Sequence, residues 1–153
     1  MSVHLATPET AEVINLEPLE PVIIRILEDG THTGHRAGLI EGSLPPGSAG
    51  PPQHIHREHD EMFFVVSGTV RFISGADHLD VASGDLVTAP IGTPHTFANP
   101  DPNQPATMLC TVTPDLFVNY FRELGALAAR GQPASPTAIF EVMSRYATEP
   151  YQP

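Results

Sequence analysis

HIHREHDEMFFVVSGTVRFISGADHLDVASGDLVTAPIGTPHTFAN is the sequence from His54 to Asn99. Gly, Pro and Asp residues divide it into short apolar runs, which predict strands joined by turns rather than helices. Runs of the same kind lie on both sides of it. Strands are therefore expected at 22–27, 37–44, 53–57, 61–67, 69–74, 78–82, 85–89, 95–98 and 106–112. Eight or more short strands with no helix between them are typical of an all-β sandwich or barrel.

The periodicity of the apolar residues changes after Pro114. Apolar side chains then recur at helical spacing in two stretches, and the second stretch begins with Ser135 and Pro136, a typical N-cap and first-turn pair. We expect helices over 115–130 and 136–147. The chain is thus divided into an N-terminal arm at 1–20 with at most a short strand, a β-barrel at 21–113 and a C-terminal helical extension at 114–153.

Charge and composition exclude several classes of function. The 153 residues carry 18 acidic and 7 basic side chains, for a net charge of −11, and every basic residue is Arg. Without Lys, the chain has no side-chain amine for a Schiff base or for covalent attachment of pyridoxal phosphate. An acidic chain without a basic cluster is also a poor partner for nucleic acid or for an anionic membrane surface.

The sequence also predicts the compartment. Cys110 is the one cysteine, so neither an internal disulfide nor a thiolate zinc cluster is possible. The segment from Met1 to Leu16 does not have the basic and apolar regions of a signal peptide, and the longest apolar runs are too short to span a membrane. We therefore expect a cytoplasmic protein.

Three histidines and one glutamate carry the candidate chemistry. His54 and His56 lie two residues apart, so in a strand their side chains project from the same face. The polar residues 57–60 can form the turn that places Glu61 on the neighbouring strand, facing the same space. By strand alternation, Phe63 and Val65 share the face of Glu61. The opposite face of this strand is also apolar, which predicts that a second sheet or a partner subunit covers it.

The spacing of these residues extends into a two-part pattern. His54-x-His56-x4-Glu61-x6-Gly68 is followed by Gly84-x5-Pro90-x-Gly92-x2-His95-x3-Asn99. The pair resembles the two motifs of the cupin superfamily, G(x)5HxH(x)3-4E(x)6G and G(x)5PxG(x)2H(x)3N. The second motif matches at every fixed position, whereas the first lacks its leading glycine because Ser48 is in that place. The resemblance implies a double-stranded β-helix, the jelly-roll cupin barrel, followed by two C-terminal helices.

The resemblance also implies a metal site. Its ligands would be His54, His56, Glu61 and His95, a set that suits one divalent transition metal per chain, whether Fe, Mn, Ni, Co or Zn. His59 is a weaker candidate, because its loop position favours exposure to solvent. Cys110 is interpreted as a small buried hydrophobic residue. The remaining histidines are expected at the surface: His4, His32, His35 and His78.

A small barrel with these ligands and a C-terminal helical pair resembles the bacterial quercetin 2,3-dioxygenase-like cupins. That resemblance implies a small-molecule substrate, dioxygen as co-substrate, and oxygenative cleavage of a flavonol or another enolisable aromatic. Glu61 would be both a metal ligand and the catalytic base. Phe63, Val65 and Phe97 would line the substrate pocket. Phe117 and Phe121 are interpreted first as core residues and second as part of a lid over the barrel mouth.

Two other functions stay open at this point. One is a metal-dependent isomerase or cyclase that uses Glu61 as base and the metal as Lewis acid. The other is a protein that binds a small molecule without turnover. For any of the three we expect a homodimer, because the strand at 22–27 and the outer face around Phe64 offer unpaired apolar surface.

Overall fold

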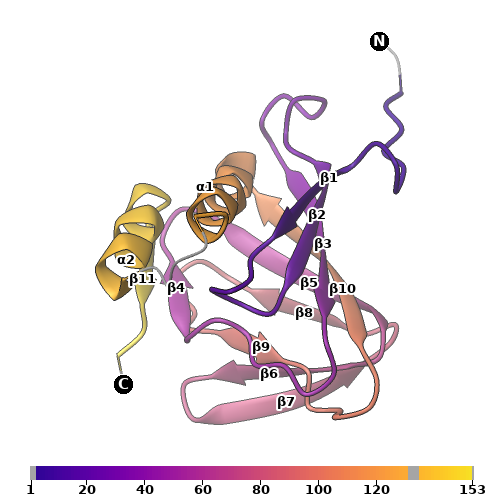
Figure 1. The fold of residues 1–153 in the computed structure, drawn as a ribbon, viewed down its shortest axis with the longest axis vertical. Helices are drawn as coiled ribbons and strands as arrows, with labels where there is room; N and C mark the ends of the chain where they lie inside the picture. The colour runs from indigo at the N-terminus through magenta and orange to yellow at the C-terminus, as the bar shows by residue number, and fades with distance from the viewer. Residues whose placement is uncertain (1–2, 131–134, 153) are drawn as a thin grey trace.

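Two layers of antiparallel strands form a barrel in the computed structural model, which describes residues 3–130 and 135–152 (Figure 1). The larger layer is one sheet of six strands. In spatial order these are β1 (Glu12–Asn15), β2 (Ile23–Glu28), β3 (Gly38–Leu44), β10 (Ala106–Thr113), β5 (Asp60–Ser67) and β8 (Leu86–Ala89). This arrangement confirms the predicted all-β jelly-roll barrel.

The smaller layer consists of two short sheets. One contains β7 (Asp77–Ala82), β6 (Thr69–Ser74) and β9 (Thr96–Ala98), and the other pairs β4 (His54–His56) with β11 (Thr148–Pro150). A β-bridge between His54 and His95 joins the two sheets. β4 carries two of the candidate ligands, and His95 is the third. The bridge that joins the two sheets therefore brings these three candidate ligands together.

Strand alternation fills the core as the sequence predicts. In β10, residues Ala106, Met108, Cys110 and Val112 are buried and alternate with more accessible ones. In β5, Glu61, Phe63 and Val65 point inward, whereas Phe64 and Val66 are 42% and 44% exposed. No sheet or helix within the described residues covers this outer apolar face. The homodimer stays a prediction, which sedimentation at micromolar concentration can check.

Glycine is required at the hairpin that joins β6 and β7. Ser74 pairs with Asp77, so the turn contains two residues, and its first residue, Gly75, has a φ of +60°. A side chain is disfavoured in this left-handed region, which explains why a Gly-containing turn signal occurs at this position.

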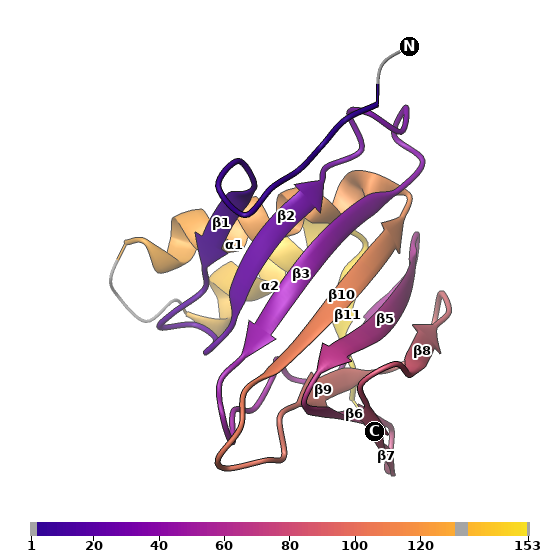
Figure 2. The same cartoon turned by 90° about the vertical axis from the view of Figure 1, so that its right-hand side faces the viewer.

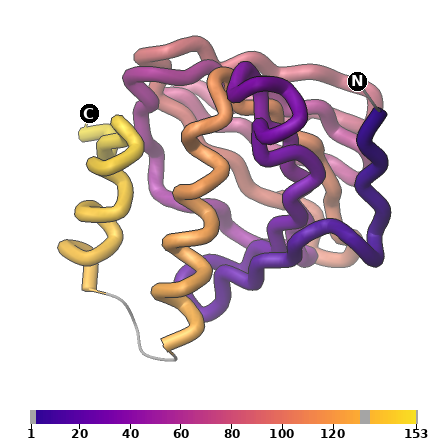
Figure 3. The backbone as a smooth tube through the Cα atoms, turned by 90° about the horizontal axis from the view of Figure 1, so that it is seen from above, coloured from indigo at the N-terminus to yellow at the C-terminus, as the bar shows by residue number. Residues whose placement is uncertain are grey.

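The chain after β10 forms helices that pack on one side of the barrel (Figures 1 and 3). A short 3-10 turn, η1 (Asp115–Phe117), leads into α1 (Val118–Ala128), and α2 (Pro136–Arg145) follows. Ser135 caps α2 as predicted, since its hydroxyl accepts a hydrogen bond from Ala138 N. Figure 2 shows the six-stranded sheet in front and both helices behind it. Neither helix has the length and hydropathy needed to span a membrane.

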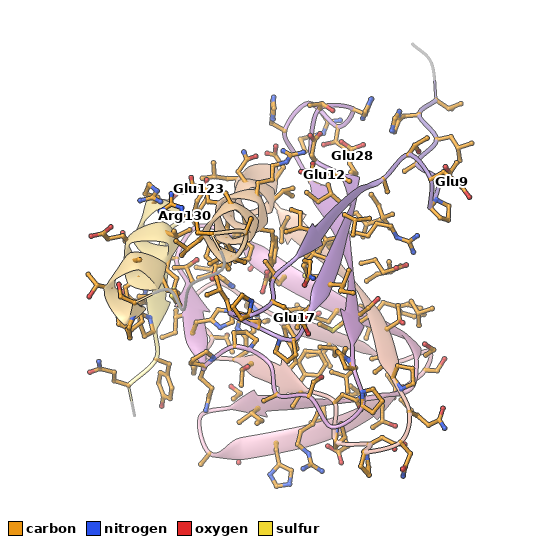
Figure 4. All side chains as sticks on the ribbon, viewed as in Figure 1. Glu9, Glu12, Glu17, Glu28, Glu123 and Arg130 are labelled. Atoms are coloured by element: carbon orange, nitrogen blue, oxygen red, sulfur yellow. The ribbon has the colours of Figure 1, made fainter. Side chains whose placement is uncertain are left out.

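An ion pair connects the two helices to each other. Glu123 of α1, which Figure 4 labels, accepts hydrogen bonds from Arg145 Nε at 3.1 Å and from the hydroxyl of Tyr146, just beyond α2. We expected a helix up to residue 147 and no strand after it. The chain instead leaves α2 after Arg145 and returns to the barrel as β11, which pairs with β4 so that Thr148 is opposite His56.

Candidate metal centre

Four buried side chains meet inside the barrel. His54 and His56 come from β4, Glu61 from β5, and His95 from the residue before β9. Their exposed fractions are 8%, 3%, 3% and 5%, and one potential ligand atom from each lies within 4.8 Å of all the others. The structure therefore brings together the four residues that the motif spacing predicts as ligands.

Backbone hydrogen bonds hold these residues in place. His54 and His95 exchange two of them, N to O in each direction, both 3.0 Å long. The loop before His95 is tied to the first motif as well, because Gly92 N donates to His56 O at 2.8 Å and Ile91 N donates to Asp60 Oδ1 at 2.8 Å. The two halves of the sequence pattern are thus physically linked through their backbones.

The tautomers of His54 and His95 follow from their partners. His54 Nδ1 lies 2.9 Å from Pro52 O, and His95 Nδ1 lies 3.0 Å from Thr93 O. A carbonyl oxygen can only accept, so each Nδ1 carries the hydrogen and donates it. In the neutral ring, Nε2 then holds the lone pair, which is the form that ligates a metal.

Thr148 fixes the third imidazole in the same way. Its hydroxyl donates to Tyr146 O at 3.0 Å, so its oxygen is left to accept from His56 Nδ1, which is 2.7 Å away. All three rings therefore present Nε2 to the centre of the cluster. Thr148 is a positioning residue that the sequence did not reveal, because it lies 92 residues from His56 and its strand has only three residues.

Charge in the cluster is concentrated on Glu61. Burial by itself would raise the pKa of this carboxyl, but the adjacent His56 and hydrogen bonds from the neighbouring histidines hold it well below its usual value. Burial lowers the pKa of His54 to about 3, with a further contribution from His56 and His95. Burial alone would lower the pKa of His95, but the hydrogen bond to Glu61 and the charge of Glu61 raise it, so His95 Nε2 donates to Glu61 Oε2 at 2.9 Å. A metal ion that displaced this proton would meet one anionic and three neutral ligands.

One nitrogen of the cluster is left without a hydrogen-bond partner. His56 Nε2 is buried and makes no hydrogen bond, although Glu61 Oε2 lies 3.1 Å away, because the geometry between them is unsuitable. Ligand atoms about 2.1 Å from one metal ion lie at most about 4.2 Å apart, so a small contraction of the 4.8 Å cluster suffices. The donor types, their lone pairs and the orphaned nitrogen all fit one divalent transition metal.

The prediction that His59 is exposed was wrong. Its side chain is 3% exposed, and its Nε2 lies 3.8 Å from Glu61 Oε1. The ring of Phe117 stacks on it with 4.4 Å between ring centroids. The sequence could not show this contact, because η1 covers His59 only after the chain has passed through the whole barrel. His59 is thus a neighbour of Glu61 rather than one of the four clustered ligands.

A cavity of about 510 Å³ opens next to His54 and Glu61. Its volume is in the range of small-molecule sites. Phe63 and Phe97 line it, as predicted, but Val65 does not, because its side chain is fully buried in the core one step further along β5. Helices form the wall that faces the sheet, and this wall includes Phe117 and Phe121. The first interpretation of these residues is confirmed, because Phe117 is buried in the hydrophobic core and Phe121 packs against it. A role as a lid stays a prediction.

Sequence reasoning also missed two polar residues of the cavity wall. Glu20, on the connection between β1 and β2, and Tyr120, on α1, both line it. From the sequence, Glu61 is expected to be the only interior carboxylate. Glu20 lies in a Pro-rich acidic segment, where a carboxylate is expected at the surface, and no periodicity distinguishes it from its neighbours.

Known proteins support the same fold. Residues 41–112 match the family model described as the cupin domain. No curated protein matches the chain. The match to the cupin domain and the solved structures below show the cupin fold and support a place in the cupin superfamily.

Three solved structures share the fold. The polyketide cyclase RemF from Streptomyces resistomycificus has a TM-score of 0.63 at 20% identity, over 73% of this chain and 80% of its own. A predicted oxalate decarboxylase from Thermotoga maritima has a TM-score of 0.62 at 21% identity, over 72% and 98%. A sugar phosphate isomerase from Silicibacter pomeroyi has a TM-score of 0.51 at 28% identity, over 59% of each chain.

Proposed function

We propose that this chain is a metal-dependent cupin enzyme whose substrate is a small, largely apolar molecule bound in the cavity. One observation carries the proposal: four buried side chains with the donor set of a transition-metal site form one end of an apolar cavity. A purely structural metal site would have no need for such a space.

A divalent transition metal held by His54, His56, Glu61 and His95 would supply Lewis acidity toward a substrate oxygen and, for a redox-active ion, a site for dioxygen chemistry. The chain itself contributes a proton acceptor. Glu61 Oε2 faces His56 and His95 at 3.1 and 2.9 Å, which leaves Oε1 as the atom that can take a proton from a substrate hydroxyl. The low pKa of Glu61 means that this acceptor is ionised when the substrate arrives.

The finer proposal is a dioxygenase that cleaves a flavonol-like or other enolisable aromatic molecule. Aromatic side chains on both walls of the cavity support it, with Phe63 and Phe97 on the barrel side and Phe117 and Phe121 on the side of the helices. Flat apolar walls suit a planar ring system. Exclusion of water by these walls would also protect a reactive, deprotonated substrate.

A metal-dependent isomerase or cyclase is the second candidate. The same Glu61 would remove a proton from an enolisable carbon, and no oxygen would be consumed. The Streptomyces polyketide cyclase has the same fold, so the fold itself is compatible with this class of reaction. A binding protein without turnover is the third candidate.

Oxygen uptake separates these candidates. Metal-loaded protein is mixed with a panel of flavonols and other enolisable aromatics, in air and under anaerobic conditions, and both dissolved oxygen and products are followed. Oxygen consumption in step with ring cleavage supports the dioxygenase. Product formation without oxygen supports the isomerase or cyclase, and saturable binding without product supports the binding protein. The His78→Ala variant, altered at an exposed histidine of β7, is the control for nonspecific metal chemistry.

A further inference from the structure

Polar side chains are rare on the wall of the cavity and lie in two places. His54 and Glu61 belong to the metal centre. Gln53 is engaged elsewhere, because its amide makes two hydrogen bonds to the backbone of Gly75, at 2.9 and 2.7 Å. Glu20 and Tyr120 are the remaining pair with strongly polar groups. The side chains between these two places are mostly aliphatic and aromatic.

The register of the large sheet places Glu20 far from the metal ligands. Glu20 precedes β2, whereas Glu61 is in β5, and β3 and β10 lie between these strands. Three steps of about 4.8 Å separate β2 from β5, which amounts to roughly 14 Å across the sheet. The inner faces of these four strands form the floor of the cavity, so the floor runs from one polar place to the other.

Within residues 3–130 and 135–152, neither the carboxyl of Glu20 nor the hydroxyl of Tyr120 makes a hydrogen bond. Only the backbone N of Glu20 does. Burial raises the pKa of the Glu20 carboxyl to about 7, and no cation offsets this. Burial also raises the pKa of the Tyr120 hydroxyl, and the charges on Glu20 and Glu61 add to the rise. Tyr120 therefore lies within electrostatic range of both carboxyl groups. Glu20 is partly exposed on the cavity wall. A carboxyl and a hydroxyl that face an apolar cavity without a protein partner in the described residues can pair with a polar group of a ligand.

We propose that Glu20 and Tyr120 form a second polar subsite, which binds a hydroxyl group of the substrate on the part of the cavity wall that the β1–β2 connection and α1 provide. The identity of the substrate rests on the proposed function, but the existence of the subsite does not. A molecule bound at both ends would be held in one orientation, with its reacting oxygen at the metal centre. Glu20 and Tyr120 would then determine which molecules the enzyme accepts.

A hydroxyl group fits this pair better than an amine. The carboxylate of Glu20 accepts a hydrogen bond and the phenol of Tyr120 donates one, and a hydroxyl can satisfy both because it is donor and acceptor at once. An ammonium group has no acceptor and would leave the hydrogen of Tyr120 unpaired. The surrounding wall is apolar, so it also disfavours a group with a full charge.

The test uses two probes of the same shape, naphthalene and 2-naphthol, with 2-naphthylamine as the amine arm. Each is titrated into metal-depleted protein, and the fluorescence of the probe gives its dissociation constant. Neither turnover nor a flavonol substrate is needed, so failure of the proposed function and failure of the subsite give different results. The variants are Glu20→Leu and Tyr120→Phe. Glu17→Leu, at an exposed position of the same connection (Figure 4), and His54→Ala, at the other end of the cavity, are the controls.

We expect the wild-type protein to bind 2-naphthol roughly threefold to tenfold more tightly than naphthalene, as one or two hydrogen bonds provide. Glu20→Leu and Tyr120→Phe should each reduce this preference to less than about twofold, while Glu17→Leu and His54→Ala keep it. Naphthalene should bind Glu20→Leu at least as tightly as wild type, which would show that the variant is folded.

Three results would overturn the proposal. The first is a preference that disappears in His54→Ala and persists in Glu20→Leu, because the hydroxyl would then bind at the metal end. The second is tighter binding of 2-naphthylamine than of 2-naphthol through Glu20. The third is the absence of saturable binding of any probe to wild-type protein that melts cooperatively.

Discussion

The two ends of the cavity differ in how they are built. The metal end consists of residues from 54 to 95, which come from β4, from β5 in the other layer and from the residue before β9, and backbone hydrogen bonds link β4 to the segment that carries His95. The second polar place is assembled from Glu20, before β2, and Tyr120, on the helix that follows β10. Chemistry is thus placed by the rigid seam of the barrel, and ligand choice by elements from both ends of the chain. Such an arrangement allows the substrate to change while the metal chemistry is kept.

The largest effect is expected at the metal end, from Glu61→Gln. This substitution keeps the size and one ligating oxygen but removes the charge and the proton acceptor. At full metal occupancy, the rate on a substrate found with the panel should fall roughly 10²- to 10⁴-fold, the usual contribution of a positioned base. Steady-state kinetics corrected for bound metal measure this.

Glu58→Gln, on the exposed turn before β5, is the matched control and should retain the wild-type rate. A metal-corrected rate of Glu61→Gln within a few-fold of wild type would contradict the role as base. The metal site and the fold would be unaffected by that result.

A smaller effect is expected from Thr148→Val, which removes the hydroxyl that accepts from His56 Nδ1. Without this partner the imidazole loses its fixed tautomer and orientation, so metal affinity should fall roughly 10- to 100-fold. Competition against a chelator of known affinity measures it. Thr148→Ser keeps the hydroxyl and should stay within about threefold of wild type. Equal affinity of the Val and Ser variants would show that the hydroxyl has no part in the site.

The smallest effect concerns the second polar place and depends on pH. The pKa of Glu20 is about 7 in the folded protein against an ordinary value of 4.5. Between these values the folded state holds a proton that the unfolded state has released, so stability falls as pH rises. Glu20→Gln has no titrating group at this position, so this decrease in stability with pH should not occur in the variant. Its free energy of unfolding should equal that of wild type near pH 4.5 and exceed it by about 1–2 kcal/mol at pH 8. The difference between the two pKa values corresponds to about 3 kcal/mol, and the partial exposure of Glu20 to solvent reduces it.

Urea denaturation of metal-free protein at the two pH values measures this difference. Glu17→Gln, at an exposed position, should show the same difference from wild type at both pH values. A Glu20→Gln variant that is less stable than wild type at pH 8 would mean that the fold stabilises the carboxylate, which contradicts an unpaired carboxyl on an apolar wall.

The same contrast explains what the sequence could predict. His54, His56, Glu61 and His95 were predictable because they occupy the fixed positions of the two motifs through which the chain resembles the cupins, and strand alternation places His54 and His56 on one face. The faces of β5 followed from alternation too, and Phe63 lines the cavity as expected. Val65 failed as a pocket residue because alternation gives the face of a strand, but not the extent of a cavity along it.

The positions of other residues could not be predicted from the sequence, because they depend on tertiary contacts. Thr148 joins His56 only after α2 has returned the chain to β4, and Phe117 buries His59 only when η1 packs over the end of β5. Glu20 lies in a segment whose composition indicates surface, and only the helices that enclose the cavity make it an interior residue. A single sequence contains no local signal for any of these contacts.

The metal content of the protein tests the central claim most directly. Wild-type protein, the double variant His54→Ala/His56→Ala and the control His78→Ala are reconstituted with the same divalent transition metals, freed of excess metal and measured by elemental analysis. We predict one metal ion per chain in wild type and in His78→Ala, and almost none in the double variant, because two of the four ligands are lost. Equal metal content in the double variant and in wild type would contradict the assignment of the site.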